Sequence, residues 1–183
     1  MMVLEDQDNS GGAMARIDYV DPAQSSDRVN ELLGKLNNSN IFRMLGHSER
    51  HLETYVRMGN AIRFKGSLDP VLRELAITRT GILCDAEYEV VAHKRIGKGV
   101  GVSDEKNDAL EKGADSDVFS YLEKAVLRFT DDVVQNNRPS AKTFDPLAES
   151  LSSTDLVELY LAIGFYIMTS KFLRTFDIDL QTG

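Results

Sequence analysis

Cysteine is nearly absent from this sequence, because its 183 residues include only one, Cys84. A single cysteine cannot form a disulfide within the chain, and a dithiol redox cycle needs a second, resolving thiol. A chain with one free cysteine fits a reducing compartment. The scarcity of cysteine therefore excludes a disulfide-stabilised fold and an intramolecular dithiol mechanism.

Positive charge is also scarce, since 21 Lys and Arg oppose 29 Asp and Glu and give a net charge of −8. This balance argues against a nucleic-acid surface and gives no attraction to anionic lipid. No run reaches the roughly 18 uninterrupted apolar residues of a membrane span. The first residues lack the basic and apolar regions of a signal peptide. We expect a soluble, cytoplasmic protein without a nucleic-acid or membrane partner.

Runs of alternating polarity that would predict β-strands are absent, and apolar residues recur instead at three- and four-residue spacing. The sequence therefore predicts an all-α fold of about seven or eight helices in one domain, residues 16–183, after a poorly ordered segment, residues 1–15. Asp69-Pro70 is typical of a helix start and predicts a helix to about Ile82. Asp85 is expected to cap the next helix, and Asp117 a later one.

The glycines near position 100 (Gly97, Gly99 and Gly101) follow a helix rather than a strand, so they predict a helix stop and not a phosphate-binding loop. The last helix, opened by Ser153-Thr-Asp155, is apolar nearly all round. Such a helix is central to a core or shared between subunits. We therefore expect a homo-oligomer.

Reactive side chains concentrate between Arg73 and His93. Glu89 and His93 are four residues apart on one helix face, where a carboxylate can orient an imidazole as a general base. Glu74 lies on the preceding helix and can reach them if the two helices form a hairpin. The alternatives are an exposed Glu–His pair of little energetic consequence and a Glu74 that only pairs with a neighbouring Lys or Arg.

Other polar residues allow two interpretations each. Arg79 is either a structural partner of Glu74 or an anchor for a substrate carboxylate. Tyr88 either packs or contacts substrate. Cys84, just before a helix, is either an activated thiol or a small buried apolar residue. His47 and His51 lack further ligands in reach, so they are only a weak indication of a metal.

Several motifs together resemble the carboxymuconolactone decarboxylase family, which includes the alkylhydroperoxidase D (AhpD)-like proteins. They extend from about residue 40 to residue 180. The motifs are Asn40-Ile-Phe-Arg43, Leu68-x-Pro70-x-Leu72-Arg73-Glu74-Leu75-Ala-Ile-x-Arg79, Glu87-Tyr88-Glu89-x-x-x-His93, Gly101-Val-Ser103-Asp-Glu105 and Leu156-Val-Glu158-Leu-x-Leu-x-Ile163-Gly164-Phe-Tyr166. The resemblance implies an all-helical, AhpD-like fold that forms dimers, trimers or hexamers.

The peroxidase branch of that family carries a glutamate and then Cys-x-x-Cys-x-x-x-His. Glu74 matches the glutamate and His93 the histidine, but Ala86 and Glu89 occupy the cysteine positions. Cys84 lies two residues before the first of them. The resemblance thus implies that the dithiol is missing and that the proton-relay half of the site remains.

Three functions follow from the resemblance and the residues together. The first is a decarboxylase-like lyase without a cofactor, in which Glu74, Glu89 and His93 act on a small carboxylated, lactone-like or cyclic substrate anchored by Arg79 or Arg73. A divalent metal held by the two glutamates and the histidine is a variant of it. The second is a peroxidase-related antioxidant protein using Cys84 and an external thiol. The third is a non-catalytic oligomeric binding protein.

Overall fold

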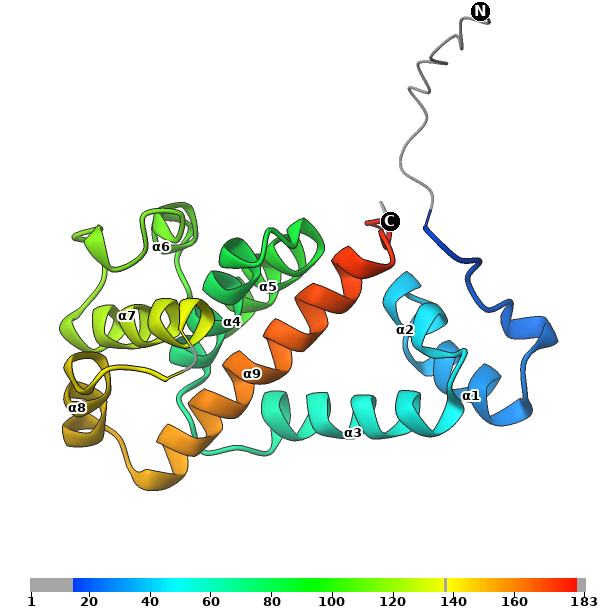
Figure 1. Cartoon of the computed structure of the whole chain (residues 1–183), viewed down its shortest axis with the longest axis horizontal. Helices are drawn as coiled ribbons and strands as arrows, with labels where there is room; N and C mark the ends of the chain where they lie inside the picture. Colours follow the sequence, from blue (N-terminus) through cyan, green and yellow to red (C-terminus); the bar gives the residue numbers. More distant parts are fainter. Residues whose placement is uncertain (1–14, 137, 181–183) are drawn as a thin grey trace, which may run out of the picture.

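The computed structural model describes residues 15–136 and 138–180, and within them the chain is all-helical (Figure 1). The fold class predicted from the sequence is confirmed, with more helices than expected. The predicted N-terminal segment falls almost entirely in residues 1–14, which lie outside the described residues. The helices are α1 (Asp27–Lys35), α2 (Asn40–Leu45), α3 (Glu49–Phe64), α4 (Pro70–Leu83), α5 (Glu87–Val100), α6 (Asp104–Ala109), α7 (Tyr121–Gln135), α8 (Ala141–Ser150) and α9 (Ser153–Thr175), with 3₁₀ turns at Pro22–Gln24 and Gly113–Asp115.

The centre of the fold is helix α4, which packs against α5, α7 and α9. Every residue from Leu72 to Gly81 is buried. Leu72 and Ala76 join Phe129 of α7 and Ile163 of α9 in the largest apolar cluster. Each fully buried leucine or isoleucine there contributes about 1.5–3 kcal/mol relative to an exposed one. The polar residues of α4 are therefore held in a rigid setting.

Helix α4 begins where the sequence predicts. The Asp69 carboxylate accepts hydrogen bonds from the Val71 and Leu72 amides at 2.8 and 3.1 Å, and Pro70 occupies the first helical position. The prediction that Asp85 caps the next helix is wrong. Asp85 has a φ of 53°, in the left-handed region, and its carboxylate pairs with Arg174. The chain needs this conformation to reverse after α4, and aspartate tolerates it better than most residues.

Close approach of α4 and α5 depends on Gly81. A Cβ atom added at Gly81 would lie 3.2 Å from Glu89 Cβ and from Val90 Cγ2. At the other end of the hairpin, Gly101 has a φ of 110° and ends α5. Of the glycines predicted to stop the helix, Gly97 and Gly99 lie inside α5 and only Gly101 ends it.

Helix α7 begins later than predicted. Its N-cap is Ser120 rather than Asp117, and Ser120 and Glu123 form a reciprocal capping box. The spacing of a serine and a glutamate three residues later is the sequence signal of this motif, and it satisfies two backbone amides at once. Its presence outweighs a lone aspartate further upstream.

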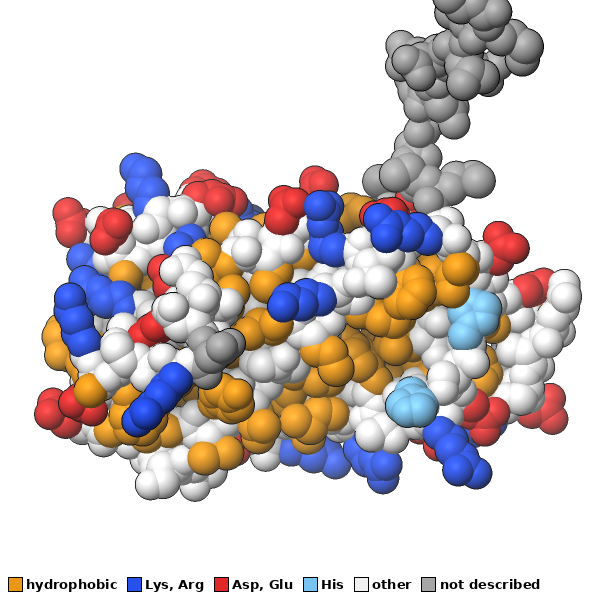
Figure 2. Space-filling model, in the orientation of Figure 1, with side chains coloured by type: hydrophobic (Ala, Val, Ile, Leu, Met, Phe, Trp, Pro, Cys, Tyr) orange, Lys and Arg blue, Asp and Glu red, His pale blue; other side chains and the backbone are white. Residues whose placement is uncertain are grey.

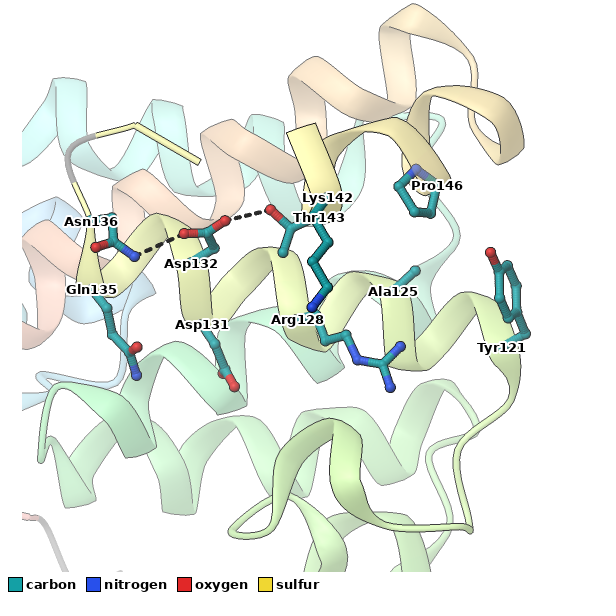
Figure 3. Close-up of a pocket in the computed structure, with 10 residues that line it drawn as sticks. All are labelled: Tyr121, Ala125, Arg128, Asp131, Asp132, Gln135, Asn136, Lys142, Thr143 and Pro146. Atoms are coloured by element: carbon teal, nitrogen blue, oxygen red, sulfur yellow. Dashed lines mark hydrogen bonds between the residues drawn. The ribbon is translucent and has the colours of Figure 1, made fainter. Parts of the chain in front are cut away.

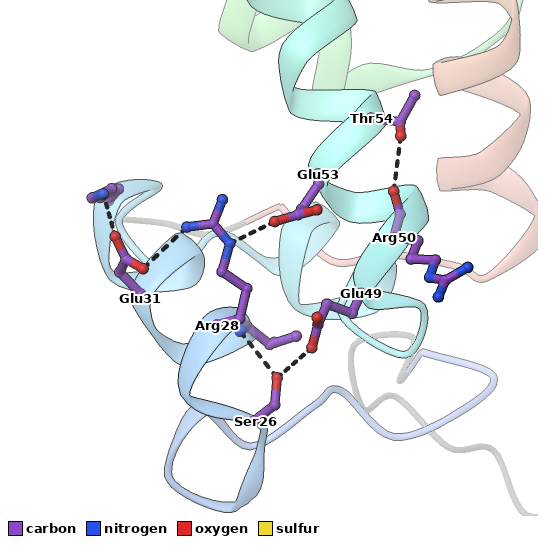
Figure 4. A network of polar contacts seen from close by, with 9 residues as sticks. Ser26, Arg28, Glu31, Glu49, Arg50, Glu53 and Thr54 are labelled. Atoms are coloured by element: carbon purple, nitrogen blue, oxygen red, sulfur yellow. Dashed lines mark hydrogen bonds and ion pairs between the residues drawn. The ribbon is translucent and has the colours of Figure 1, made fainter.

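Hydrogen bonds and ion pairs on the surface connect helix α1 to α3 (Figure 4). Ser26 Oγ donates to Glu49 at 2.6 Å, and Arg28 pairs with both Glu31 and Glu53. These side chains are about half exposed, so each pair contributes only about 0.2–1 kcal/mol. The buried residues beneath them (Val29, Leu33 and Leu52) carry more of the stability.

Helix α9 runs diagonally across the molecule and keeps part of its apolar surface exposed (Figures 1 and 2). Val157, Tyr160 and Met168 are each more than half exposed. By length and composition α9 is the one helix of the described residues that can cross a membrane. It packs against α3, α4, α7 and α8, as a core helix of a globular fold does.

Candidate functional site

Glu74 lies in the middle of α4 and is completely buried. Its Oε2 lies 2.6 Å from His93 Nδ1, and its Oε1 accepts a hydrogen bond from Arg73 Nε at 3.1 Å. A buried carboxylate is tolerated only when such donors satisfy it. The hairpin predicted from the sequence thus brings Glu74 to His93.

The second nitrogen of His93 faces Glu89, with Nε2 3.4 Å from Glu89 Oε2. Both side chains lie on α5 and both are 4% exposed. The sequence predicts Glu89 as the residue that orients His93, but the shorter contact is made by Glu74. Since an ionised Glu74 only accepts, the proton of Nδ1 is assigned to that bond, and Nε2 faces Glu89.

The two carboxylates differ in their proton affinity. Burial alone raises the pKa of Glu74, but the hydrogen bonds and charges of His93 and Arg73 outweigh it and lower that pKa below the usual value. Burial raises the pKa of Glu89, and the attraction of His93 and Arg63 only partly opposes it. Environments that drive two titratable groups apart are typical of an acid and a base with separate roles.

A pocket of about 400 Å³ opens beside this cluster, and Glu89 and His93 form part of its wall. The remaining wall is rich in aromatic rings. The His93 ring meets that of Tyr166 edge-on, with centroids 4.6 Å apart. The aromatic residues lining the pocket are Phe42, Tyr55, Tyr88, Phe165 and Tyr166. Such a wall suits a small ring compound, because aromatic faces and edges pack well on one another.

The tyrosines of the pocket keep their protons. Burial raises the pKa values of Tyr55, Tyr88 and Tyr166 above the usual value. The Tyr55 hydroxyl lies 2.6 Å from Thr169 Oγ1, which ties α3 to α9 across the pocket. Tyr88, predicted as a substrate-binding residue, lines this pocket.

Arg79 lies elsewhere. Its guanidinium donates to both carboxylate oxygens of Asp131 at 2.6 and 3.1 Å and to the carbonyls of Leu110 and Glu111 at 2.8 and 3.0 Å. It is absent from the wall of the pocket. The expectation that Arg79 anchors a substrate carboxylate therefore needs correction, because its donors are already engaged in holding α4 to α7. Arg73, the other expected anchor, is bonded to Glu74.

Cys84 is half-buried at the end of α4 and also lies outside the pocket wall. Burial raises the pKa of its thiol, and the charge of Lys171 only partly opposes this. A raised pKa reduces the fraction of thiolate, the reactive form.

Several residues of the pocket were not singled out from the sequence. Arg63, Tyr55 and Phe165 come from α3 and α9, far from the motif around His93. The one available signal was the Gly164-Phe-Tyr166 motif, two of whose residues reach the pocket. Arg63 has no local pattern to mark it.

Metal ligation has no clear candidate. Among residues 15–136 and 138–180, no group of three or more His, Cys, Asp and Glu side chains is arranged to hold an ion. His47 Nε2 instead contacts the Asp18 carbonyl at 2.8 Å, and His51 Nδ1 contacts Ser48 Oγ at 2.7 Å.

A second cavity, of about 630 Å³, lies between α7 and α8 (Figure 3). Its carboxylate Asp132 accepts hydrogen bonds from Thr143, Ser140 and Asn136, which lower its pKa to about 2. Arg128 and Lys142, the cations of this wall, are exposed. With no buried acid–base group, this cavity is a weaker candidate than the pocket beside His93.

Comparison with known structures agrees with the fold. An AhpD-core, peroxidase-related protein from Ralstonia eutropha JMP134 superposes with a TM-score of 0.83 at 17% identity, covering 94% of this chain and 95% of the other. The debrominase Bmp8, in complex with 2,3,4-tribromopyrrole, superposes with a TM-score of 0.78 at 14% identity over 94% and 95%. The putative antioxidant defence protein AhpD from Agrobacterium tumefaciens gives 0.69 at 18% over 75% and 94%. No curated protein matches the sequence significantly.

The helical fold is thus AhpD-like. Residues 49–132 also match the model of the carboxymuconolactone decarboxylase family. The chain is therefore similar to this family over residues 49–132, and to AhpD-like proteins in its fold.

Proposed function

We propose that this protein is a thiol-independent acid–base enzyme, decarboxylase-like in its chemistry, that acts on a small carboxylated, lactone-like or cyclic substrate. The observation that carries the proposal is the placement of His93 between two carboxylates of opposite pKa shift at the wall of an aromatic pocket. The complex of the debrominase Bmp8 with 2,3,4-tribromopyrrole supports a small ring as the class of ligand.

In the proposed step, Glu74 holds the imidazole by its Nδ1 proton and stabilises positive charge on the ring. Nε2, which faces Glu89, is the nitrogen that exchanges a proton with Glu89 or with substrate. In a decarboxylation, the bond between the ring carbon and the carboxylate breaks, carbon dioxide leaves, and the electron pair enters the conjugated ring. A proton from Glu89 or His93 then bonds to that carbon, and a solvent proton replaces it.

The peroxidase alternative has less support. Cys84 is the chain's one cysteine, its pKa is raised, and it does not line the pocket. The non-catalytic alternative predicts a solidly packed site without an open cavity, and a pocket of about 400 Å³ beside Glu89 and His93 disfavours it.

Assembly through α9 remains a proposal. Its exposed apolar residues (Val157, Tyr160, Leu161 and Met168) form a face that a second copy of the chain can cover. Residues of that kind on one helix are typical of a subunit interface.

The proposal is tested with His93→Ala and a panel of cyclic and lactone carboxylates, followed by ultraviolet absorbance and by release of carbon dioxide. We expect turnover to fall about 10²–10⁴-fold, the range typical of a lost general acid–base group. His51→Ala is the matched control, because His51 is exposed and lies outside the pocket. Full turnover by a folded His93→Ala protein would contradict the proposal.

A further inference from the structure

Arg63 at the end of α3 lines the same pocket as Glu89 and His93. Its Nε atom is buried without a hydrogen-bond partner among the described residues. The carbon at the centre of its guanidinium lies 4.7 Å from the centroid of the Phe64 ring. A ring beneath a guanidinium steadies it and leaves its in-plane N–H groups free to donate. A buried donor without an acceptor is costly, so Arg63 is placed to donate to an acceptor that residues 15–136 and 138–180 do not supply.

The charge of the pocket agrees with this. The chain as a whole has a net charge of −8, yet the wall of the pocket contains three cations (Lys35, Arg63 and Arg95) and a single carboxylate, Glu89. Lys35 is already paired with Glu31 at 2.6 Å. Arg95 is exposed, which leaves Arg63 as the one cation of the pocket wall that is partly buried and whose charge acts on Glu89. The formal charge of the residues that line the pocket is thus opposite in sign to that of the whole protein, which favours an anionic ligand.

We infer that Arg63 is the anion-binding residue of the pocket, and that it holds a carboxylate of a small ring-bearing substrate beside Glu89 and His93. This inference rests on the proposed function of the pocket and adds to it the residue that selects the substrate class. The planar fork of an arginine matches the two oxygens of a carboxylate and fixes the attached ring in one orientation. Arg63 is thus a specificity-determining residue in the role first expected of Arg79.

The test compares two ring compounds of nearly equal shape, benzoate and uncharged benzamide, by isothermal titration calorimetry. The wild-type protein is expected to bind benzoate about tenfold or more tightly than benzamide, the difference that a charge-assisted hydrogen bond gives. In Arg63→Gln the benzoate affinity should fall to that of benzamide. In Arg63→Lys, which keeps the charge but loses the fork, it should lie between the two.

Arg57→Gln is the matched control, because Arg57 is an exposed arginine on the same helix and lies outside the pocket wall. It should bind benzoate like the wild type. Circular dichroism shows whether each variant is folded. If Arg63→Gln does not fold, the benzoate affinity of Arg63→Lys is compared with that of the wild type instead. Equal affinity of the wild type for both compounds, no binding of benzoate, or full benzoate affinity in Arg63→Gln would each overturn the inference.

Because this experiment measures binding alone, its outcome is separate from that of the proposed function. Turnover retained in His93→Ala removes the acid–base mechanism and leaves the benzoate result standing. If benzoate binds equally well to the wild type and to Arg63→Gln, Arg63 is not the carboxylate-binding residue, and the effect of His93→Ala on turnover is unaffected. The two failures are therefore distinguishable.

Discussion

Arg79 and Arg63 differ in how many of their guanidinium N–H groups have a hydrogen-bond partner within the described residues. Arg79 donates to both oxygens of Asp131 and to two backbone carbonyls, whereas a buried nitrogen of Arg63 has no partner in the part of the chain that the structure describes. Of these two arginines, Arg63 is the one that lines a pocket together with Glu89 and His93. The difference shows that an arginine's role depends on what remains unpaired around it. A fully paired arginine stabilises the fold, and an incompletely paired one is available to a ligand.

The largest effect on stability is expected at Arg79. Arg79→Ala leaves Asp131 and two carbonyls without their donor, and we expect a loss of about 3 kcal/mol in the free energy of unfolding. Urea unfolding followed by circular dichroism measures it. In Arg63→Met the buried Nε atom has no hydrogen bond to lose among the described residues, so the free energy of unfolding should change by only about 1 kcal/mol or less. Similar losses in both variants would contradict the comparison.

A smaller, pH-dependent change in the free energy of unfolding is expected on substitution of Glu89 or Glu74. The pKa of Glu89 is raised in the folded protein, so its contribution to stability is present at low pH and is lost as the pH rises through that pKa. Glu89→Gln should therefore gain stability over the wild type as the pH rises from about 4 to about 8. The groups that face Glu89 and set this behaviour are Arg63, Glu74, His93 and the tyrosines 55, 88 and 166.

Glu74→Gln is the matched variant with the opposite sign. The pKa of Glu74 is lowered, so its contribution is present above the usual carboxyl pKa and is lost as the pH falls through the folded value. The glutamine variant should be less stable than the wild type at neutral pH, with a difference that shrinks on acidification. Thermal unfolding over the same pH series measures both variants. Parallel pH profiles for the two would refute the division of roles between Glu74 and Glu89.

The smallest effect on activity and binding is expected at Cys84, which contacts neither Arg79 nor Arg63 in any hydrogen bond or pocket described above. Cys84→Ser should leave both turnover and benzoate binding unchanged, because the thiol is half-buried, has a raised pKa and does not line the pocket. The same assays measure it. A loss of activity on this substitution would return the thiol-dependent peroxidase to consideration.

Much of the site was accessible from the sequence, because Glu89 and His93 lie one helical turn apart and spacing alone places them on one face. The exchange of roles between Glu74 and Glu89 was not accessible, since it depends on a 2.6 Å contact between two helices. Likewise, Arg79 was misassigned because its partner Asp131 lies 52 residues away. Arg63 was missed because only the packing of α3 against the other walls reveals its unpaired nitrogen.

The fold class followed from the period of apolar residues, and the start of α4 from Asp69-Pro70. The start of α5 was not predicted correctly from the sequence. Asp85 adopts a left-handed conformation because the chain reverses there, so it does not act as the expected helix cap. Local signals therefore predicted the helices well and the corner between them poorly.

The close contact at Gly81 gives a residue outside the site control over its geometry. Because Gly81 has no side chain, the backbone of α4 can pack closely against the Cβ atom of Glu89 on α5. Any larger residue there must shift α5 away from α4 by a few tenths of an ångström, and with it the 2.6 Å contact between Glu74 on α4 and His93 on α5. Evolution or design can thus tune proton exchange in this protein through helix spacing, while every acid, base and pocket residue stays the same.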